Sequence, residues 1–415
     1  MNELKKSKLN GYIVPLAIVS ILFFVIGFGI GISGFLTPFL QDAFNLSTSQ
    51  SYLVTAAIFS AFVIFGAPAG VVIRKVGYKK AMVIAFFVMA IGMMLFVPSS
   101  KLLSFPLFLL ALFIGGVGNT LLQAAVNPYV TIIGPKKSAA MRMSLMGIMN
   151  KSAWWLSSIF LGLFLDLKNV KIDDIIFPFY IVTAILVGLG IFMIFAPLPE
   201  VKAEGEDESD LETGAGIASN KTSIFQFPHL LLGVLALFIY VGVETLPMVS
   251  VIGYAKAIFG GSAINLDHFA LFVPLGMVIG YVFGVIMIPK YVSQTTALKA
   301  FALIGIGSAL LLIFLPGELS IYTLALLGFA NSLMWPAIWP LAIADLGKFT
   351  KTGASLLVMG IVGGAVIPLI FGFIVDMVQT TDVITVANYK SAFWIFIPSY
   401  LYILFFAIKG YKIRK

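Results

Sequence analysis

Residues Asn119–Trp155 read N-T-L-L-Q-A-A-V-N-P-Y-V-T-I-I-G-P-K-K-S-A-A-M-R-M-S-L-M-G-I-M-N-K-S-A-W-W, two apolar runs joined by a basic turn. Each run is long enough to cross a bilayer, which takes about 20 helical residues. Polar residues nevertheless interrupt them: Gln123 and Asn127 in the first run, Asn150 and Lys151 in the second. A lysine at that depth costs roughly 2.5 to 3.5 kcal/mol, so such groups normally face a cavity or a partner. The stretch therefore indicates the wall of a polar pathway through a membrane.

The composition of the whole chain agrees with a membrane location. The 415 residues are 60% hydrophobic and only 11% charged, which is about half the charge of an ordinary soluble domain. The net charge of +8 does not indicate nucleic-acid binding, because the basic residues fall in short loops between apolar runs. There is no cysteine, and no histidine stands at metal-ligand spacing to a second ligand, so we expect no metal and no cofactor.

The apolar runs predict twelve membrane-spanning helices. None of the runs alternates with period two, which leaves helices as the spanning element. The predicted spans are 11–40, 49–73, 81–99, 104–133, 140–165, 174–198, 227–254, 267–288, 295–316, 319–346, 353–378 and 391–409.

The basic residues predict the orientation of these spans. If both termini are cytoplasmic, 20 of the 26 lysine and arginine residues lie on the cytoplasmic side, five lie outside, and Lys151 remains within a span. This is a strong positive-inside bias. We therefore expect a multi-pass protein of the cell (inner) membrane with both termini in the cytoplasm.

The chain also divides into two similar halves. Gly134-Pro135-Lys136-Lys137 precedes Met146-Gly147-Ile148, and a comparable turn at Gly347 precedes Met359-Gly360-Ile361 at the same offset. An acidic connection separates the halves. The predicted domains are an N-terminal six-helix bundle at 1–198, a cytoplasmic linker at 199–226 and a C-terminal six-helix bundle at 227–415. Two pseudo-symmetric bundles with a substrate site at the midplane make up the major facilitator arrangement.

Several segments resemble the fucose:proton symporter family, a sugar-transporting branch of the major facilitator superfamily that includes glucose/galactose transporters. The resemblance lies in L-L-Q-A-A-V-N-P-Y-V-T-I-I-G-P before residue 136, R-M-S-L at 142–145, Y-V-G-V-E at 240–244 and the block 331–368. The loop at 70–80 is also similar, although Arg74 replaces the acid usual in that motif. The resemblance covers essentially the whole chain and implies secondary transport of a sugar.

The chain departs from this family at the two positions that are implicated in proton coupling. The fucose permeases carry an aspartate in the first span and a glutamate in the fourth, and both are implicated in coupling. The matching residues here are Gly34 and Gln123, which cannot titrate. Glu244 is the only acid well inside a predicted span, and it is therefore the candidate coupling residue.

The candidate substrate-binding residues are amide, indole and ammonium groups within predicted spans. Trp335 and Trp339 are four residues apart, hence on one helix face, and indole faces stack well against the C–H face of a sugar. The full candidate set is Gln123, Asn127, Asn150, Lys151, Asn331, Trp335 and Trp339. Structural roles remain open alternatives: the amides can clamp helices together, and Glu244 can pair with Lys151.

Transport is the function class that these features favour. With one acid and no histidine well inside the predicted spans, the sequence lacks the paired groups that a membrane enzyme needs for catalysis. The polar residues within the spans also do not form the repeated rings that are typical of a channel. We expect a functional monomer in the lipid bilayer that takes up a hexose, deoxyhexose or amino sugar by alternating access and cation symport, with H+ or Na+ as the coupling ion. The alternatives are an anionic sugar of the uronic or sialic acid type, read by Lys151, and an uncoupled facilitator.

Overall fold

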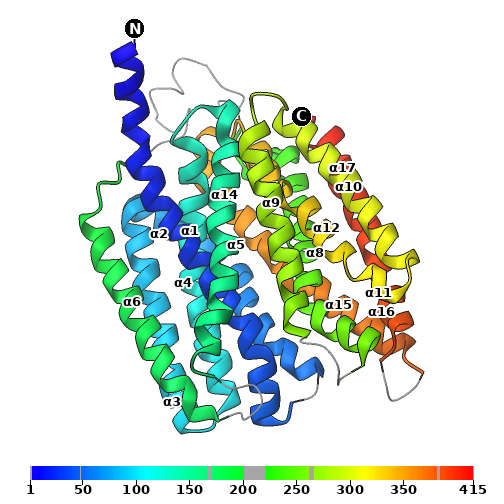
Figure 1. Cartoon of the computed structure of the whole chain (residues 1–415). Helices are drawn as coiled ribbons and strands as arrows, with labels where there is room; N and C mark the ends of the chain where they lie inside the picture. Colours follow the sequence, from blue (N-terminus) through cyan, green and yellow to red (C-terminus); the bar gives the residue numbers. More distant parts are fainter. Residues whose placement is uncertain are drawn as a thin grey trace. The chain divides into compact units, whose positions relative to one another are not determined.

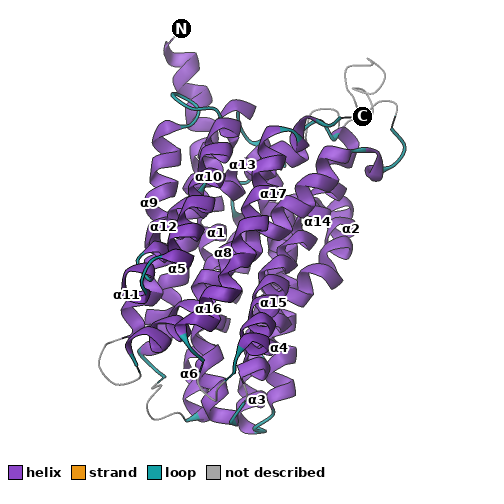
Figure 2. Cartoon of the chain, turned by 90° about the vertical axis from the view of Figure 1, so that its right-hand side faces the viewer, coloured by secondary structure: helices purple, strands orange, loops and turns teal. Residues whose placement is uncertain are grey.

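The computed structural model describes residues 2–46, 48–165, 171–200, 221–260, 266–380 and 384–414. In these ranges every regular element is a helix, and Figure 2 accordingly shows helices and loops without a strand. Most of the predicted linker, residues 201–220, lies outside the described residues.

Ten of the described α-helices have 13 or more residues and carry most of the chain, while the other α-helices have ten or fewer; Figure 1 labels them along the chain. The first set comprises α1 (Asn2–Phe44), α2 (Thr48–Met94), α4 (Phe105–Ile132), α5 (Ala139–Gly162), α6 (Ile176–Phe195), α8 (Pro228–Phe259), α9 (Phe272–Met287), α10 (Gln294–Phe314), α15 (Gly363–Val378) and α17 (Phe396–Ile408). The others are α3 (Phe96–Lys101), α11 (Gly317–Ser320), α12 (Thr323–Ser332), α13 (Met334–Ile343), α14 (Thr350–Met359) and α16 (Val386–Ala392).

Ten helical segments of the described chain are long and apolar enough to cross a membrane. One of them, Leu53–Lys101, has 49 residues, and its backbone leaves helical geometry at Gly77, where φ is 82° and ψ is 172°. It therefore contains two of the predicted spans. Helix α5 contains most of the predicted span 140–165; it has 24 residues but is less apolar, because it carries Asn150 and Lys151. With these two assignments, the described helices account for all twelve predicted spans.

The described residues group into two compact units. Unit 1 consists of Met1–Ala139, Ser152–Gln226 and Asp345–Met359, and unit 2 consists of Ala140–Lys151, Phe227–Ala344 and Gly360–Lys415. Helix α5 contributes to both, because the boundary follows Lys151. The predicted domain boundaries at 198 and 227 are a different division of the chain and remain a prediction.

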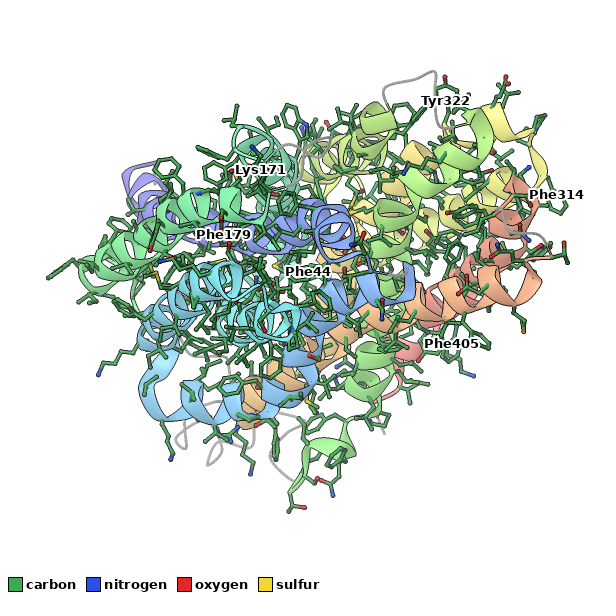
Figure 3. All side chains as sticks on the ribbon, turned by 90° about the horizontal axis from the view of Figure 1, so that it is seen from below. Phe44, Lys171, Phe179, Phe314, Tyr322 and Phe405 are labelled. Atoms are coloured by element: carbon green, nitrogen blue, oxygen red, sulfur yellow. The ribbon has the colours of Figure 1, made fainter. Side chains whose placement is uncertain are left out.

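Unit 1 is built on the close packing of α2 against α4. A Cβ added to Gly92 would lie 2.4 Å from the backbone nitrogen of Gly115, so only glycine permits this approach. Small residues at helix contacts are typical of membrane bundles, where close backbone approach replaces the hydrophobic driving force. Beside this contact, Phe96 stacks on Phe179 with ring centroids 4.0 Å apart, and Figure 3 labels Phe179 on α6.

One turn in unit 1 depends on glycine for a different reason. At Gly77 the positive φ is a conformation that side chains with a Cβ rarely adopt. The next residue, Tyr78, donates its backbone N–H to the Glu200 carboxylate at 2.7 Å. The Tyr129 hydroxyl donates to the Pro199 carbonyl at 2.9 Å. The segment after α6 is thereby fixed to the turn inside α2 and to α4.

Unit 2 repeats the pattern of close helix contacts. A Cβ on Gly363 would lie 1.8 Å from the Phe238 carbonyl oxygen, which brings α15 directly against α8. The surface of the unit is apolar: Phe314 is 70% exposed and Tyr322 58% exposed, and both lie at its periphery in Figure 3. Exposed aromatic side chains of this kind suit a lipid environment rather than water.

Candidate functional site

The centre of the candidate site is an ion pair between α5 and α8 in unit 2. The Lys151 Nζ lies 2.9 Å from Glu244 Oε1, and the two side chains are only 7% and 11% exposed. Among the residues whose burial is described, Glu244 is the one buried carboxylate. Two opposite charges removed from water must compensate each other, because an unpaired charge in that position is strongly destabilising.

Helix α8 is held in place beside Glu244 by a side chain from α12. Pro247 lacks an N–H, so the carbonyl of Val243, four residues earlier, loses its normal helical donor. The Asn331 side-chain amide donates to this carbonyl at 3.0 Å. In turn, the Tyr400 hydroxyl donates to the Asn331 Oδ1 at 2.9 Å. Asn331 therefore satisfies the backbone group that the proline leaves open, at the residue next to Glu244.

Two tyrosines extend the surroundings of the ion pair. Tyr240 precedes Glu244 by four residues and shares its face of α8, and Tyr281 of α9 lies near both. A Cβ on Gly147 would lie 2.5 Å from the Tyr281 ring. Because Gly147 is one turn before Lys151 on α5, the glycine gives Tyr281 its room next to the pair.

An aromatic group adjoins this cluster. The Tyr240 ring lies 6.2 Å from that of Trp335 at a tilt of 55°, and Trp335 stacks on Trp339 with centroids 5.4 Å apart. Trp339 is fully buried, whereas Trp335 is partly exposed. Tyr240, Trp335 and Trp339 thus form one continuous set of contacting rings, which we call the aromatic set.

The aromatic set contains one buried polar atom without a hydrogen-bond partner among the described residues, the Nε1 of Trp339. The Tyr240 hydroxyl instead interacts with the Glu244 carboxylate and the Tyr281 hydroxyl. A buried polar group left unsatisfied costs about 1 to 3 kcal/mol. Such groups need an explanation, and the approach of a polar ligand is one.

A second set of predicted residues lies on α4 in unit 1. The Gln123 Nε2 donates to the Asn119 Oδ1 at 2.8 Å, and the Asn127 Nδ2 donates to the Gln123 carbonyl at 3.0 Å. All three amides are buried on one face of the helix, four residues apart. The Asn127 Oδ1 is buried without a hydrogen-bond partner in the part of the chain described. This amide ladder leaves one acceptor open.

The structure brings together several of the residues predicted from the sequence. Lys151 contacts Glu244, Asn331 braces α8 beside it, and the two tryptophans stack and reach Tyr240, all in unit 2. Asn150 precedes Lys151 on α5 and is half-buried. Gln123 and Asn127 adjoin each other in unit 1. Their roles toward a substrate stay predictions.

Sequence reasoning did not single out Tyr240, Tyr281 or Gly147. The sequence did contain a signal for a role of Tyr240 beside Glu244, because the tyrosine stands four residues before the acid in the middle of a predicted span. Tyr281 had none, since its proximity to Glu244 depends on how α9 packs against α5. Among the described residues, no group of three or more histidine, aspartate or glutamate side chains could hold a metal.

Paired charges and amides in the middle of spanning helices are typical of membrane transport proteins. The chain belongs to the Major Facilitator Superfamily, whose family model matches residues 19–367. It is a multi-pass membrane transporter and not an enzyme. The predicted all-helical membrane fold of the major facilitator type is thereby confirmed.

Individual relatives agree with the predicted branch of the family. A glucose/galactose transporter of Brucella abortus (biovar 1, strain 9-941) is 30% identical over 415 residues, covering 98% of this chain and 96% of the relative. An L-fucose-proton symporter of Escherichia coli (strain K12) is 29% identical over 390 residues, with 88% of each protein covered. The crystal structure of the transporter FucP in the outward conformation matches with a TM-score of 0.77 and 26% identity, covering 95% of this chain and 98% of that one.

Proposed function

We propose that this protein is a secondary active transporter that takes up a neutral sugar across the cytoplasmic membrane. Sugar uptake is coupled to the inward movement of a cation that binds at Glu244. The relatives supply the substrate class, since their names include glucose/galactose transporters and fucose-proton symporters. A hexose or deoxyhexose fits a site of amides and indoles, and an amino sugar does as well.

The observation that carries the choice of a neutral substrate is the Lys151–Glu244 pair. A lysine that binds a substrate carboxylate must not already be paired with an acid of the protein. Here the Glu244 Oε1 lies 2.9 Å from the Lys151 Nζ. The two charges neutralise each other inside unit 2. The site therefore requires no charge from the sugar, and this argues against the uronic or sialic acid alternative.

Glu244 also provides a place for the coupled proton. Protonation would neutralise the carboxylate and end its attraction for Lys151, so the presence of the proton would change the force that holds α5 to α8. Gly34 and Gln123, which match the coupling acids of the fucose permeases, offer no comparable group. A proton rather than Na+ is the simplest ligand for a single carboxylate, because Na+ prefers several oxygen ligands.

The polar residues that remain are proposed to recognise sugar hydroxyls. Asn127 has an open acceptor on α4, and Gln123 adjoins it. In unit 2, Asn150 is a half-buried amide and Trp335 is a partly exposed indole, whereas the buried Asn331 amide already bonds to Val243 and Tyr400. Both termini are proposed to be cytoplasmic, on the basis of the lysine and arginine distribution.

The test is counterflow of labelled sugars in proteoliposomes that contain the purified protein. We expect exchange of D-glucose, D-galactose or L-fucose, and accumulation driven by an inward proton gradient but not by a sodium gradient. Exchange of only acidic sugars such as glucuronate would contradict a neutral substrate. Exchange of neutral sugars without accumulation in either gradient would contradict coupling.

A further inference from the structure

A closed set of contacts joins Glu244 to two neighbouring helices, α5 and α9. The Lys151 Nζ of α5 lies 2.9 Å from the Glu244 Oε1 of α8. The Tyr240 hydroxyl interacts with the same carboxylate and with the hydroxyl of Tyr281 on α9. The Tyr281 ring in turn lies against Gly147, one turn before Lys151 on α5. The carboxylate is therefore linked to α5 by two routes, through the ammonium and through the two tyrosines.

The Tyr281 side chain has a mainly apolar environment. Its ring belongs to a buried cluster that includes Ala140 and Leu333, and only 3% of the residue is exposed. Neither of these neighbours offers a side-chain hydrogen-bond acceptor. A Cβ on Gly147 would lie 2.5 Å from two atoms of the ring, so the glycine lets the ring pack on the backbone of α5. The position of the Tyr281 hydroxyl beside Tyr240 therefore depends on where α5 lies.

The titratable groups that interact with Glu244 in the described chain come from four helices. Lys151 lies on α5, Tyr240 on α8, Tyr281 on α9 and Tyr400 on α17. The Tyr400 hydroxyl already donates to an amide of α12. A nearby ammonium and a hydrogen bond from a hydroxyl both stabilise the charged form of a carboxylate. Lys151 and Tyr240 thus both oppose the protonation of Glu244.

We propose that Tyr281 is a positioning residue for the coupling carboxylate: it holds the Tyr240 hydroxyl on Glu244 for as long as its ring packs on Gly147 of α5. A tyrosine hydroxyl can donate one hydrogen and also accept, so Tyr240 can donate to the carboxylate while its oxygen contacts Tyr281. Tyr281 acts through Tyr240 and does not itself bind the coupled proton. This inference rests on the proposed function, since it assumes that this proton binds at Glu244.

The arrangement links proton binding at Glu244 to the position of α5. If α5 moves away from α8 and α9, the carboxylate loses the Lys151 ammonium, and the Tyr281 ring loses its contact with Gly147. Both changes remove stabilisation from the charged carboxylate and favour uptake of a proton. The linkage is reciprocal, so a proton on Glu244 favours the release of α5. Because α5 continues past Lys151 into unit 1, this change involves a helix that both units share.

The test is the pH profile of sugar accumulation in proteoliposomes at a constant pH difference across the membrane, normalised to exchange by the same variant. The labelled sugar is whichever of D-glucose, D-galactose or L-fucose the wild-type protein exchanges. Tyr281→Phe keeps the ring against Gly147 and removes the hydroxyl. The external pH of half-maximal accumulation should rise by about one unit, because the charged carboxylate loses a hydrogen bond. Tyr254→Phe is the matched control: its hydroxyl pairs with Ser320 in the same unit, and its loss should leave the profile unchanged.

Further variants distinguish positioning from an independent contribution. Tyr240→Phe should shift the profile in the same direction, and the double variant with Tyr281→Phe should shift it no further, because Tyr281 acts through Tyr240. Gly147→Ala should displace the Tyr281 ring and give a similar shift. Gly307→Ala on α10 should give none, since its Cβ would meet no atom within 4 Å. Apparent Tm in detergent shows that each variant is folded.

A folded Tyr281→Phe protein with the wild-type profile would overturn this inference and leave the proposed function intact. Additive shifts in the double variant would do the same, because they would show that Tyr281 does not act through Tyr240. Absence of proton-driven accumulation by the wild-type protein, or undiminished accumulation by Glu244→Gln, would overturn the proposed coupling and this inference together.

Discussion

Asn331 donates its side-chain amide to the carbonyl oxygen of Val243, the backbone group that Pro247 deprives of a helical donor. The bond joins α12 to α8 at the residue before Glu244. A kinked helix and its brace thus set the position of the buried carboxylate, and the brace is itself fixed by Tyr400.

Asn331→Ala should destabilise the protein by about 1 to 3 kcal/mol, because it leaves a buried carbonyl without a partner. The measurement is apparent Tm in detergent. Pro247→Ala provides the control, since alanine restores the N–H that Val243 lacks. In the Pro247→Ala background, Asn331→Ala should cost clearly less. Equal costs in the two backgrounds would show that the amide does not serve this carbonyl.

Glu244→Gln should abolish gradient-driven accumulation of sugar while exchange continues. Glutamine cannot carry the proton, but its amide oxygen can still accept a hydrogen bond from Lys151, which preserves part of the local contact. Proteoliposomes loaded with unlabelled sugar measure exchange, and an imposed proton gradient measures accumulation. Undiminished accumulation by this variant would mean that another group carries the coupled ion.

Gly77→Ala should lower the free energy of unfolding by about 1 to 3 kcal/mol from the backbone conformation alone, and the apparent Tm with it. The new Cβ would also lie 2.8 Å from the Glu200 Oε1, which crowds the bond from Tyr78. Gly188→Ala on α6 is the matched control, since its Cβ would meet no atom within 4 Å. If both variants keep the wild-type Tm, the turn tolerates a side chain and the contact with Glu200 is not important for stability.

The positive-inside bias predicts that the connection between the two halves is cytoplasmic. The chain has no cysteine, so a single cysteine at position 208 reports its location without background. An impermeant maleimide should label it in inverted vesicles and not in intact cells. Labelling in intact cells would reverse the proposed topology.

The sequence predicted the membrane class and the number of spans because hydrocarbon imposes a length and an apolar composition on each helix. It also singled out Lys151 and Glu244, since charges within apolar runs stand out, and it left open whether they pair. It could not resolve this, because the meeting of α5 and α8 depends on packing between helices about ninety residues apart. The same limit applies to Tyr281, which reaches the pair only because Gly147 leaves space for its ring. Asn331 illustrates a further limit: an amide suited to a sugar hydroxyl is equally suited to a carbonyl beside a proline.

The central claim is that Lys151 and Glu244 neutralise each other, so that the substrate carries no charge. Stability of Lys151→Met, Glu244→Leu and the double variant tests it most directly, through apparent Tm in detergent. Removing one partner of a buried pair costs about 3 to 5 kcal/mol, whereas replacing both by apolar side chains is often neutral. We predict that each single variant has a clearly lower Tm and that the double variant recovers most of the loss. Single variants with the wild-type Tm would contradict the pairing, and so would a double variant whose loss of Tm equals the sum of the two single losses. Either result would favour the alternative in which Lys151 binds the carboxylate of an anionic sugar.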